Sequence, residues 1–329
     1  DPAQVPTSPV KPQLVLMTAI GALLGLLVGF FAIVLMDQIR NTLRRTDDVV
    51  TKLGRPLLTA IPKLSGASTR KIARMQTLMP DSLYAEAIRT LATSVALAGM
   101  EKDMKVVAIS SAMDDEGKTA VACNLAAALA TTRRVLLLDA DLRRPSVSAA
   151  MGLPPGTPGL VQLLTRRASL DQCIKGVRSS PLRVLPAGRA ASNALDLLMS
   201  SRFDKLIAEL KKHFDTIIID CPPVQLVSDT LVLGRAASSM IFVARSDSTP
   251  LQVTRRALHR IDKAGIPVLG VALNAHDFAQ ADRFYGESSG YGHDYAYAYG
   301  RTGERRRSSG SRSSSVPTVT QVAPDTQTT

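Results

Sequence analysis

Tryptophan is absent from this chain of 329 residues, and aromatic residues make up only 4% of it. A folded core must therefore be built from aliphatic side chains. The three cysteines, Cys123, Cys173 and Cys221, are isolated, with neither a CxxC pair nor a histidine at metal-ligand spacing. This scarcity argues against a zinc site or a disulfide framework, and it fits a reducing compartment.

Acidic residues are too few to balance the basic ones, which leaves a formal net charge of +12. A charge of this size is consistent with binding to nucleic acid, but its distribution favours another partner. Residues 37–80 hold nine Lys and Arg against three Asp, so this short segment carries +6, half of the excess. The meaning of the charge therefore depends on what precedes residue 37.

Charged residues are missing altogether from residues 14–36, a run of 23 that is long enough to span a bilayer. Such a length without a polar break is atypical of a buried core helix, and no clear n-region or cleavage site marks a signal peptide. Gly21, Gly25 and Gly29 recur every four residues. They either form a face for close packing of a second helix or are ordinary membrane glycines.

Basic residues flank this run unequally, because Arg40, Arg44 and Arg45 follow it and only Lys11 precedes it. The positive-inside rule then predicts that the chain after the run is cytoplasmic. The basic segment would lie against anionic lipid, so no nucleic-acid partner is needed. Residues 1–13 are predicted to be a Pro-rich extracytoplasmic lead-in, and the start at Asp1 suggests a piece of a longer protein.

The stretch KVVAISSAMDDEGKT, residues 105–119, combines a buried strand, a loop ending in Gly117-Lys118-Thr119, and an alanine-rich helix. This order predicts a phosphate-binding P-loop. Backbone N–H groups would face the phosphates, Lys118 would reach the β and γ oxygens, and the Thr119 hydroxyl would bind Mg²⁺. The pattern departs from the usual one, because Ala112 replaces the first glycine, and Asp114 and Asp115 stand where Pro and Gly are common.

Two later strands also end in carboxylates. Residues 135–145 carry Asp139 and Asp141 on one face of a strand end, and residues 216–223 carry Asp220 before two prolines. In an open parallel sheet, ligands bind at the carboxyl ends of the strands, so all three carboxylates should converge near the loop. A single Asp there is often a helix cap. Three of them behind a Gly-Lys-Thr loop indicate nucleotide binding instead.

The rest of the body, about residues 102–275, alternates strand-like runs (105–109, 134–138, 216–219, 240–244, 268–273) with helix-like runs (118–131, 202–213, 250–264). This alternation predicts an α/β fold with a doubly wound parallel sheet. Residues 146–200 should be loop-rich with short helices. We expect a short helix and a connector containing LTAIP in residues 37–80. An amphipathic helix is expected over 82–100, with Leu83, Ala87, Leu91 and Val95 on its apolar face.

Tyrosines gather near the carboxyl terminus. Five of the six in the chain are Tyr285, Tyr291, Tyr295, Tyr297 and Tyr299, embedded in Gly, Ser, Asp and Ala without a packing period. Tyrosines in a core would have aliphatic neighbours, which these lack. The Arg/Ser-rich and Thr/Gln/Pro-rich sequence beyond them, residues 301–329, is predicted to be disordered.

Together these features resemble the bacterial tyrosine kinases (BY-kinases) of exopolysaccharide and capsule biosynthesis, the cytoplasmic modules of polysaccharide co-polymerases. SLYAEAIRTLATSV (82–95) resembles the family's EAFRxLRT helix, and residues 108–130 resemble its Walker A region. LLLDADLRRP (136–145) resembles the A′ motif, the most specific of the set, and IIIDCPP (217–223) resembles Walker B.

The resemblance implies domains at 1–13 (lead-in), 14–36 (membrane helix), 37–80 (basic connector), 81–280 (kinase) and 281–329 (tyrosine tail). It implies ATP and Mg²⁺ as cofactors. It assigns nucleotide binding to Asp115, Glu116, Gly117, Lys118, Thr119, Ala120 and Asn274, catalysis to Lys118, Asp139 and Asp141, and metal binding to Thr119, Asp139 and Asp220. Of Asp139 and Asp141, one would help to hold Mg²⁺ and the other would accept the tyrosine proton; we favour Asp139 as the base.

The implied partners are other copies of the chain in a homo-oligomer or ring, the polysaccharide polymerisation and export machinery, a cognate tyrosine phosphatase and the anionic membrane surface. The implied location is the bacterial inner membrane, with autophosphorylation of the five tail tyrosines in trans. The family's ExxRxxR pattern ends here in Ala92, which weakens an expected subunit contact. The sequence starts without the family's first membrane helix and periplasmic domain, so we expect it to be a C-terminal portion of a longer protein or to work with a separate partner subunit. The alternative is a non-kinase P-loop ATPase that acts as a nucleotide-dependent membrane scaffold or chain-length regulator.

Overall fold

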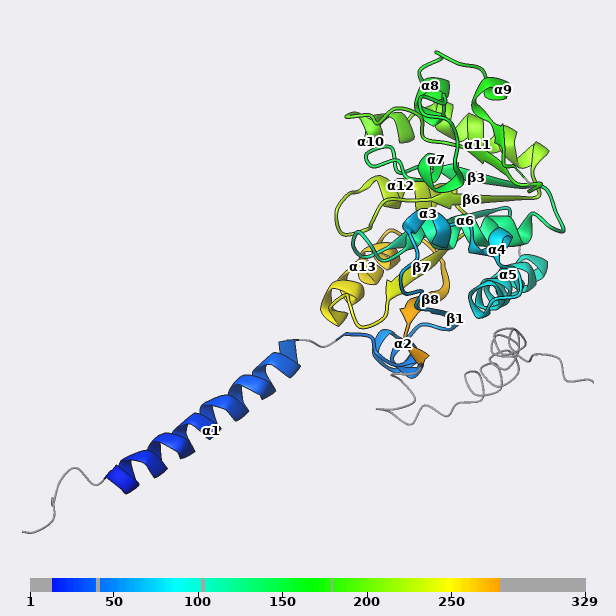
Figure 1. Cartoon of the computed structure of the whole chain (residues 1–329). Coiled ribbons are helices and arrows are strands. Elements are labelled where there is room, and N and C mark those ends of the chain that lie inside the picture. The colour runs from blue at the N-terminus through cyan, green and yellow to red at the C-terminus, as the bar shows by residue number, and fades with distance from the viewer. Residues whose placement is uncertain (1–13, 40–41, 102–103, 179, 279–329) are drawn as a thin grey trace, which may run out of the picture. The chain divides into compact units, whose positions relative to one another are not determined.

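The computed structural model describes residues 14–39, 42–101, 104–178 and 180–278 (Figure 1). The expectations for the lead-in, residues 1–13, and for the tail with its tyrosine cluster, residues 281–329, lie outside the described residues.

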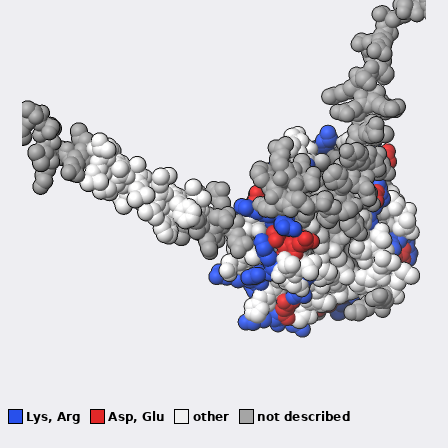
Figure 2. Space-filling model, turned by 90° about the horizontal axis from the view of Figure 1, so that it is seen from below, with Lys and Arg blue, Asp and Glu red and all other residues white. Residues whose placement is uncertain are grey.

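Helix α1 (Leu14–Ile39) covers the uncharged run. Its stretch Val15–Ile33 is long and apolar enough to cross a membrane, with a mean hydropathy of 2.4, and none of it is buried against the protein. In Figure 2 the described surface of this helix shows neither basic nor acidic atoms. A Cβ added at Gly21, Gly25 or Gly29 would meet nothing within 4 Å, so the face that these glycines share is open.

The described part of the globular domain is built on an eight-stranded sheet with the order β1-β8-β7-β2-β6-β3-β5-β4. All neighbouring strands run parallel except the short pair β4 and β5. The strands are β1 (Leu57–Pro62), β2 (Val106–Ser111), β3 (Val135–Asp139), β4 (Lys175–Gly176), β5 (Arg183–Leu185), β6 (Thr216–Asp220), β7 (Ser239–Arg245) and β8 (Val268–His276).

Helices cover both faces of this sheet (Figure 1). The described helices after α1 are α2 (Thr46–Leu53), α3 (Thr69–Ile72), α4 (Met75–Leu78), α5 (Leu83–Glu101), α6 (Lys118–Leu129), α7 (Val147–Met151), α8 (Leu160–Leu164), α9 (Leu170–Cys173), α10 (Ala194–Leu198), α11 (Ser201–His213), α12 (Asp229–Ala236) and α13 (Leu251–Lys263).

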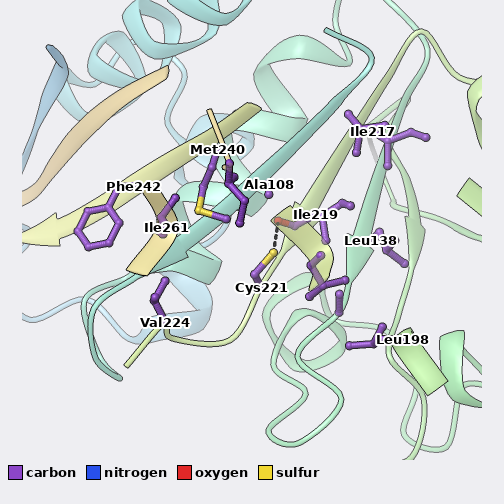
Figure 3. Packing of buried hydrophobic residues seen from close by; sticks show 14 of the residues in the cluster. Ala108, Leu138, Leu198, Ile217, Ile219, Cys221, Val224, Met240, Phe242 and Ile261 are labelled. Carbon is purple, nitrogen blue, oxygen red and sulfur yellow. Dashed lines mark hydrogen bonds between the residues drawn. The ribbon is translucent and has the colours of Figure 1, made fainter. Parts of the chain in front are cut away.

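The central strands are buried on both sides because their apolar side chains alternate between two cores. On one face, Val107 and Ile218 pack in the core that includes α5 and α6. On the other, Ala108 and Ile219 pack in the core that includes α11, α12 and α13, part of which Figure 3 shows. The predicted doubly wound α/β fold is confirmed. Short helices fill residues 146–200 as predicted, although the brief strands β4 and β5 there were not anticipated.

The LTAIP segment differs from its expected role as part of a connector. It forms β1, which pairs in parallel with β8 at one edge of the sheet, and its Ile61 is fully buried. A six-residue run that ends in proline carries little period-2 signal, so its strand character comes from the pairing with β8 rather than from the sequence.

The buried face of α5 also differs from the prediction. Leu83 is 41% exposed, whereas Tyr84, Ile88, Leu91 and Val95 are buried. A strict four-residue spacing advances about 40° per step around a helix of 3.6 residues per turn, so it cannot stay on one face. Alternating steps of four and three follow the face that packs on the sheet. Of the predicted set, Leu91 and Val95 are buried and Ala87 packs partly buried against the same core, so only Leu83 is wrong.

The segment that enters the globular domain docks on the loop between β7 and α13. Leu43 is buried, and its carbonyl accepts a hydrogen bond from Asp247 N at 2.7 Å. The Asp247 carboxylate accepts bonds from Thr42 Oγ1 at 3.1 Å and Arg44 Nε at 3.0 Å. These contacts fix a loop that, as described below, touches the phosphate-binding loop.

Candidate active site

The Gly-Lys-Thr loop joins β2 to α6, as predicted. Gly117, at the N-terminus of α6, has φ of +90°, and a Cβ added there would lie 2.1 Å from Asn274 Nδ2. Glycine is thus required at this position both by the left-handed backbone and by the neighbouring side chain. The first amides of α6 have no intrahelical acceptor and lie at the positive end of the helix dipole, which makes this an anion-binding end.

Two departures of the loop from the usual pattern have structural accommodations. Ala112, in place of the first glycine, is fully buried in the core beneath the sheet, so its methyl group packs rather than obstructs. Asp115 adopts the left-handed conformation, with φ of +62°. Asp is one of the few residues other than glycine that populate this region.

The carboxylates at the ends of β3 and β6 meet Lys118 and Thr119, as the sequence predicted for parallel strands. Lys118 Nζ lies 3.2 Å from Asp141 Oδ2; Asp141 is buried and Lys118 is partly buried. Thr119 Oγ1 donates to Asp220 Oδ2 at 2.7 Å. It also lies 2.9 Å from Ser146 Oγ, a residue that the sequence analysis did not single out.

Asp139 is buried more deeply than Asp141. Its Oδ1 accepts a hydrogen bond from Asp141 N at 3.2 Å, and its Oδ2 accepts one from Val147 N at 3.1 Å. Complete burial, with the charge of Asp220 nearby, raises the pKa of Asp139 well above its usual range. Burial likewise raises the pKa of Asp220 to about 6, although Lys118 and Thr119 oppose this change.

Lys118 is affected in the opposite way. Burial lowers the pKa of its ammonium group, but the carboxylates of Asp220, Asp141 and Asp139 outweigh that effect, and the pKa is raised overall. Lys118 therefore stays protonated. One partly buried ammonium group thus lies near three buried carboxyl groups, an excess of acidic groups that suits a cation-assisted reaction on phosphates.

The residues fit a magnesium ion, which takes oxygen ligands and keeps several waters. Asp220 Oδ1 is buried and has no hydrogen-bond partner among the described residues, while the other oxygen of this carboxylate accepts from the Thr119 hydroxyl. Within the described ranges, no three His, Cys, Asp or Glu side chains are close enough to hold a metal by themselves. Mg²⁺ in phosphate-transfer sites is usually bound by one or two protein carboxylates together with phosphate oxygens and waters.

Two arginines of the LRRP segment hold the loop after β3. Arg143 makes a bidentate pair with the buried carboxylate of Asp229, at 2.7 and 3.1 Å. Arg144 Nη1 lies 2.7 Å from Asp114 Oδ2 and so links this loop to the phosphate-binding loop. The sequence analysis did not predict Asp229, because one carboxylate at a helix start resembles an ordinary N-terminal charge.

The remaining predicted nucleotide residues lie in or beside the loop. Ala120 is in the first turn of α6, and Asn274 Nδ2 donates to Glu116 O at 2.8 Å. The Glu116 carboxylate is only 2% exposed and contacts Thr249 Oγ1 at 2.5 Å. The five tail tyrosines lie outside the described residues.

The loop, the convergent carboxylates and the parallel sheet define a P-loop nucleotide-binding domain. Residues 104–264 match the AAA domain family. The chain is 30% identical to the tyrosine-protein kinase wzc of Salmonella typhimurium over 311 aligned residues. The alignment covers 90% of this chain and 42% of that protein. The chain thus spans about two fifths of the length of such curated relatives.

Solved structures resemble the same region. The kinase domain of Escherichia coli tyrosine kinase ETK superposes with a TM-score of 0.64 at 29% identity, covering 69% of this chain and 94% of that one. The VpsO kinase domain is 38% identical, with a TM-score of 0.55, and covers 58% of this chain and 94% of that one. The chain belongs to the bacterial tyrosine kinase family, which confirms the family that the motifs predicted.

Proposed function

We propose that this protein is an ATP-dependent protein-tyrosine autokinase whose acceptors are the tyrosines of its own carboxyl-terminal tail. The observation that carries the proposal is the junction of Lys118, Thr119 and the carboxylates of Asp141 and Asp220 at the N-terminus of α6. The kinase names of the relatives support the reaction class.

In the proposed reaction, Lys118 contacts the β and γ phosphates of ATP together with the first amides of α6. The tyrosine oxygen forms a bond to the γ phosphorus while the bond from that phosphorus to the β–γ bridging oxygen breaks, which yields ADP and phosphotyrosine. Thr119 and Asp220, with Asp139 behind them, would hold Mg²⁺. A bound Mg²⁺ supplies positive charge against the charge on the transferred phosphoryl group.

The tyrosine hydroxyl has a pKa near 10, so it needs a group that accepts its proton at neutral pH. Asp139 was favoured from the sequence, but its contacts argue for Asp141. Both oxygens of Asp139 accept hydrogen bonds from backbone amides, and the side chain is fully buried. Asp141 accepts one backbone amide, from Arg144, while its other oxygen faces the Lys118 ammonium group at the phosphate-binding loop. We therefore assign the base role to Asp141.

The tail can supply the acceptors. The described chain ends at residue 278, just after β8, whose Asn274 contacts the phosphate-binding loop. The tyrosines at 285–299 follow within 7 to 21 residues, a contour length of roughly 25–75 Å. Such a tail reaches the site of a neighbouring copy as readily as its own, so we propose transfer in trans within a homo-oligomer.

The same proposal includes the location and partners. The helix α1 spans the bacterial inner membrane, the basic residues after it face anionic lipid in the cytoplasm, and the kinase acts on the polysaccharide polymerisation and export machinery, reset by a tyrosine phosphatase. A reporter fused after residue 280 should be active only as a cytoplasmic reporter. Periplasmic activity of that fusion would reject the orientation.

The kinase proposal is tested by mixing two full-length variants in detergent with Mg-ATP. One is Lys118→Met with its tail intact, and the other is catalytically intact with all five tail tyrosines changed to Phe. Phosphotyrosine on the Lys118→Met chain, detected by antibody and mass spectrometry, is the expected result. If wild type hydrolyses ATP but labels no tyrosine, the protein is instead the nucleotide-dependent scaffold that its unusual loop and Ala92 would suit. If wild type labels its own tyrosines but the Lys118→Met chain in the mixture stays unlabelled, transfer in trans is rejected.

A further inference from the structure

The outer side of the phosphate-binding loop is tied to the ends of β7 and β8. Arg245 Nη1 donates to Asp115 O at 3.0 Å, and Asn274 Nδ2 donates to Glu116 O at 2.8 Å. In a trans peptide the carbonyl and the following N–H point in opposite directions. Holding these two successive carbonyls therefore turns the amides of Glu116 and Gly117 to the other side of the loop.

The side chain of Glu116 adds a third tie. Its Oε2 accepts a hydrogen bond from Met113 N at 2.6 Å, within the loop, and its Oε1 accepts one from Thr249 Oγ1 at 2.5 Å. With 2% of its surface exposed, this carboxylate does not face solvent or an anionic ligand. Its contacts brace the loop backbone from within and link it to residue 249.

The supporting residues are themselves fixed. Arg245, the last residue of β7, lies in register with Asn274 of β8. Ser246 N donates to Asn274 O at 2.8 Å, and Asp247 N donates to Leu43 O at 2.7 Å. The loop between β7 and α13 is thus held in place by the sheet and by the segment that follows α1.

We propose that Arg245 and Thr249 are positioning residues of the nucleotide site, which orient the amides of the phosphate-binding loop through Asp115 and Glu116. Arg245 also explains how a non-glycine residue is held at φ of +62°, because its guanidinium group binds the carbonyl of that residue. The inference rests on the proposed function only in requiring that the loop binds nucleotide phosphates.

Thr249→Val tests the inference, because it keeps the shape of the side chain and removes the hydroxyl donor. In the full-length protein in detergent, the Kd of a fluorescent ADP analogue with Mg²⁺ should rise about tenfold, the effect of losing a hydrogen bond to a charged group. Thr249→Ser should restore the Kd to within about twofold of wild type. At saturating ATP, kcat for tyrosine transfer should change far less than KM for ATP.

The matched control is Thr131→Val, just beyond the C-terminal end of α6, where the hydroxyl donates to Ala128 O and, among the described residues, to no other group. It should leave the Kd unchanged. Wild-type affinity in Thr249→Val, or equal losses in the Val and Ser variants, would overturn the assignment of Thr249. If Thr249→Val lowers the melting temperature of the nucleotide-free protein, a loss of affinity in that variant could come from unfolding. Arg245→Ala then tests the positioning role instead, since the side chain of Arg245 is exposed and its removal should leave folding intact.

Arg245→Ala should weaken nucleotide binding severalfold, whereas Arg134→Ala, at the start of β3, should not. Equal affinities in these two variants would reject the role of Arg245. The outcomes separate this inference from the kinase proposal: nucleotide binding without tyrosine transfer would reject the kinase and leave the positioning role standing. A wild-type protein that binds no nucleotide would reject both.

Discussion

The two ends of strands β3 and β6 place aspartates in opposite environments. At the amino-terminal end, Asp215 is half-exposed and pairs with Arg134 at 2.7 Å, and these hydrogen bonds lower the pKa of Asp215 to about 2. At the carboxyl-terminal end, Asp139 and Asp220 are fully buried, and burial raises the pKa of each.

The difference shows that the carboxyl-terminal ends of these strands are less favourable for folding than the amino-terminal ends. At the amino-terminal end each charge has a partner and water, so the pair is nearly neutral for folding. At the carboxyl-terminal end, three buried carboxyl groups lie near one ammonium group, and this excess of acidic groups away from solvent is costly unless a ligand adds positive charge. Perturbed pKa values of this kind cluster at functional sites. The variants below test whether this contrast is functional.

The largest expected effect comes from Lys118→Met, which removes the cation that interacts with all three carboxyl groups. ATP turnover should fall by about a thousandfold or more, because the charge on the β and γ phosphates loses its fixed counterpart. Turnover is measured by release of labelled phosphate. Lys212→Met, which breaks only the exposed pair with Glu209, is the control. Equal turnover in the two variants would show that the site has been misassigned.

Asp220→Asn should separate stability from activity. The pKa of Asp220 is raised to about 6 in the folded state, so the folded state binds more protons than the unfolded state between about pH 4 and pH 6. Stability is therefore lost as the pH rises through this window, by about 3 kcal/mol above pH 6. The Asn variant should lack this loss and melt at a higher temperature at pH 7.5, while Mg-dependent turnover falls.

Asp215→Asn is the matched control for that variant. The pKa of Asp215 is lowered, so its carboxylate stabilises the fold above the unfolded pKa and loses this effect as the pH falls through about 2. Its removal should lower the melting temperature slightly at pH 7.5 and leave turnover intact. Changes of the same sign in the two Asn variants would contradict the contrast between the two strand ends.

A smaller effect is expected from Asp229→Asn. This change weakens the bidentate pair with Arg143, and the loop that carries Asp141 would then lose one of its anchors. Tyrosine transfer at saturating ATP should fall about tenfold, while the Kd for ADP stays within about twofold. A parallel rise in the Kd would show that Asp229 supports the whole site rather than the loop after β3.

Arg134→Ala should have the smallest effect. The guanidinium group of Arg134 is solvent-exposed, so its pairing with Asp215 is screened by water and salt. The melting temperature should change by no more than about 2 °C, and that change should shrink further in 1 M NaCl. A large, salt-insensitive fall in melting temperature would mean that the Arg134–Asp215 pair is not a weak, solvent-screened pair, which would contradict the contrast between the two strand ends.

The sequence by itself determined the central strands, their terminal aspartates, α6 and its Gly-Lys-Thr start, because unbroken apolar runs and the order strand, loop, helix are local signals. It also predicted that Asp139, Asp141 and Asp220 converge, since parallel strands end at the same edge. Only the tertiary structure decided the partners of Glu116 and Arg143, which lie 133 and 86 residues away in the chain. These contacts depend on the strand order β8-β7-β2-β6-β3, which places the end of β7 beside the phosphate-binding loop. Long-range contacts of this kind leave no period in the sequence, because each side chain involved is polar and isolated within its own segment.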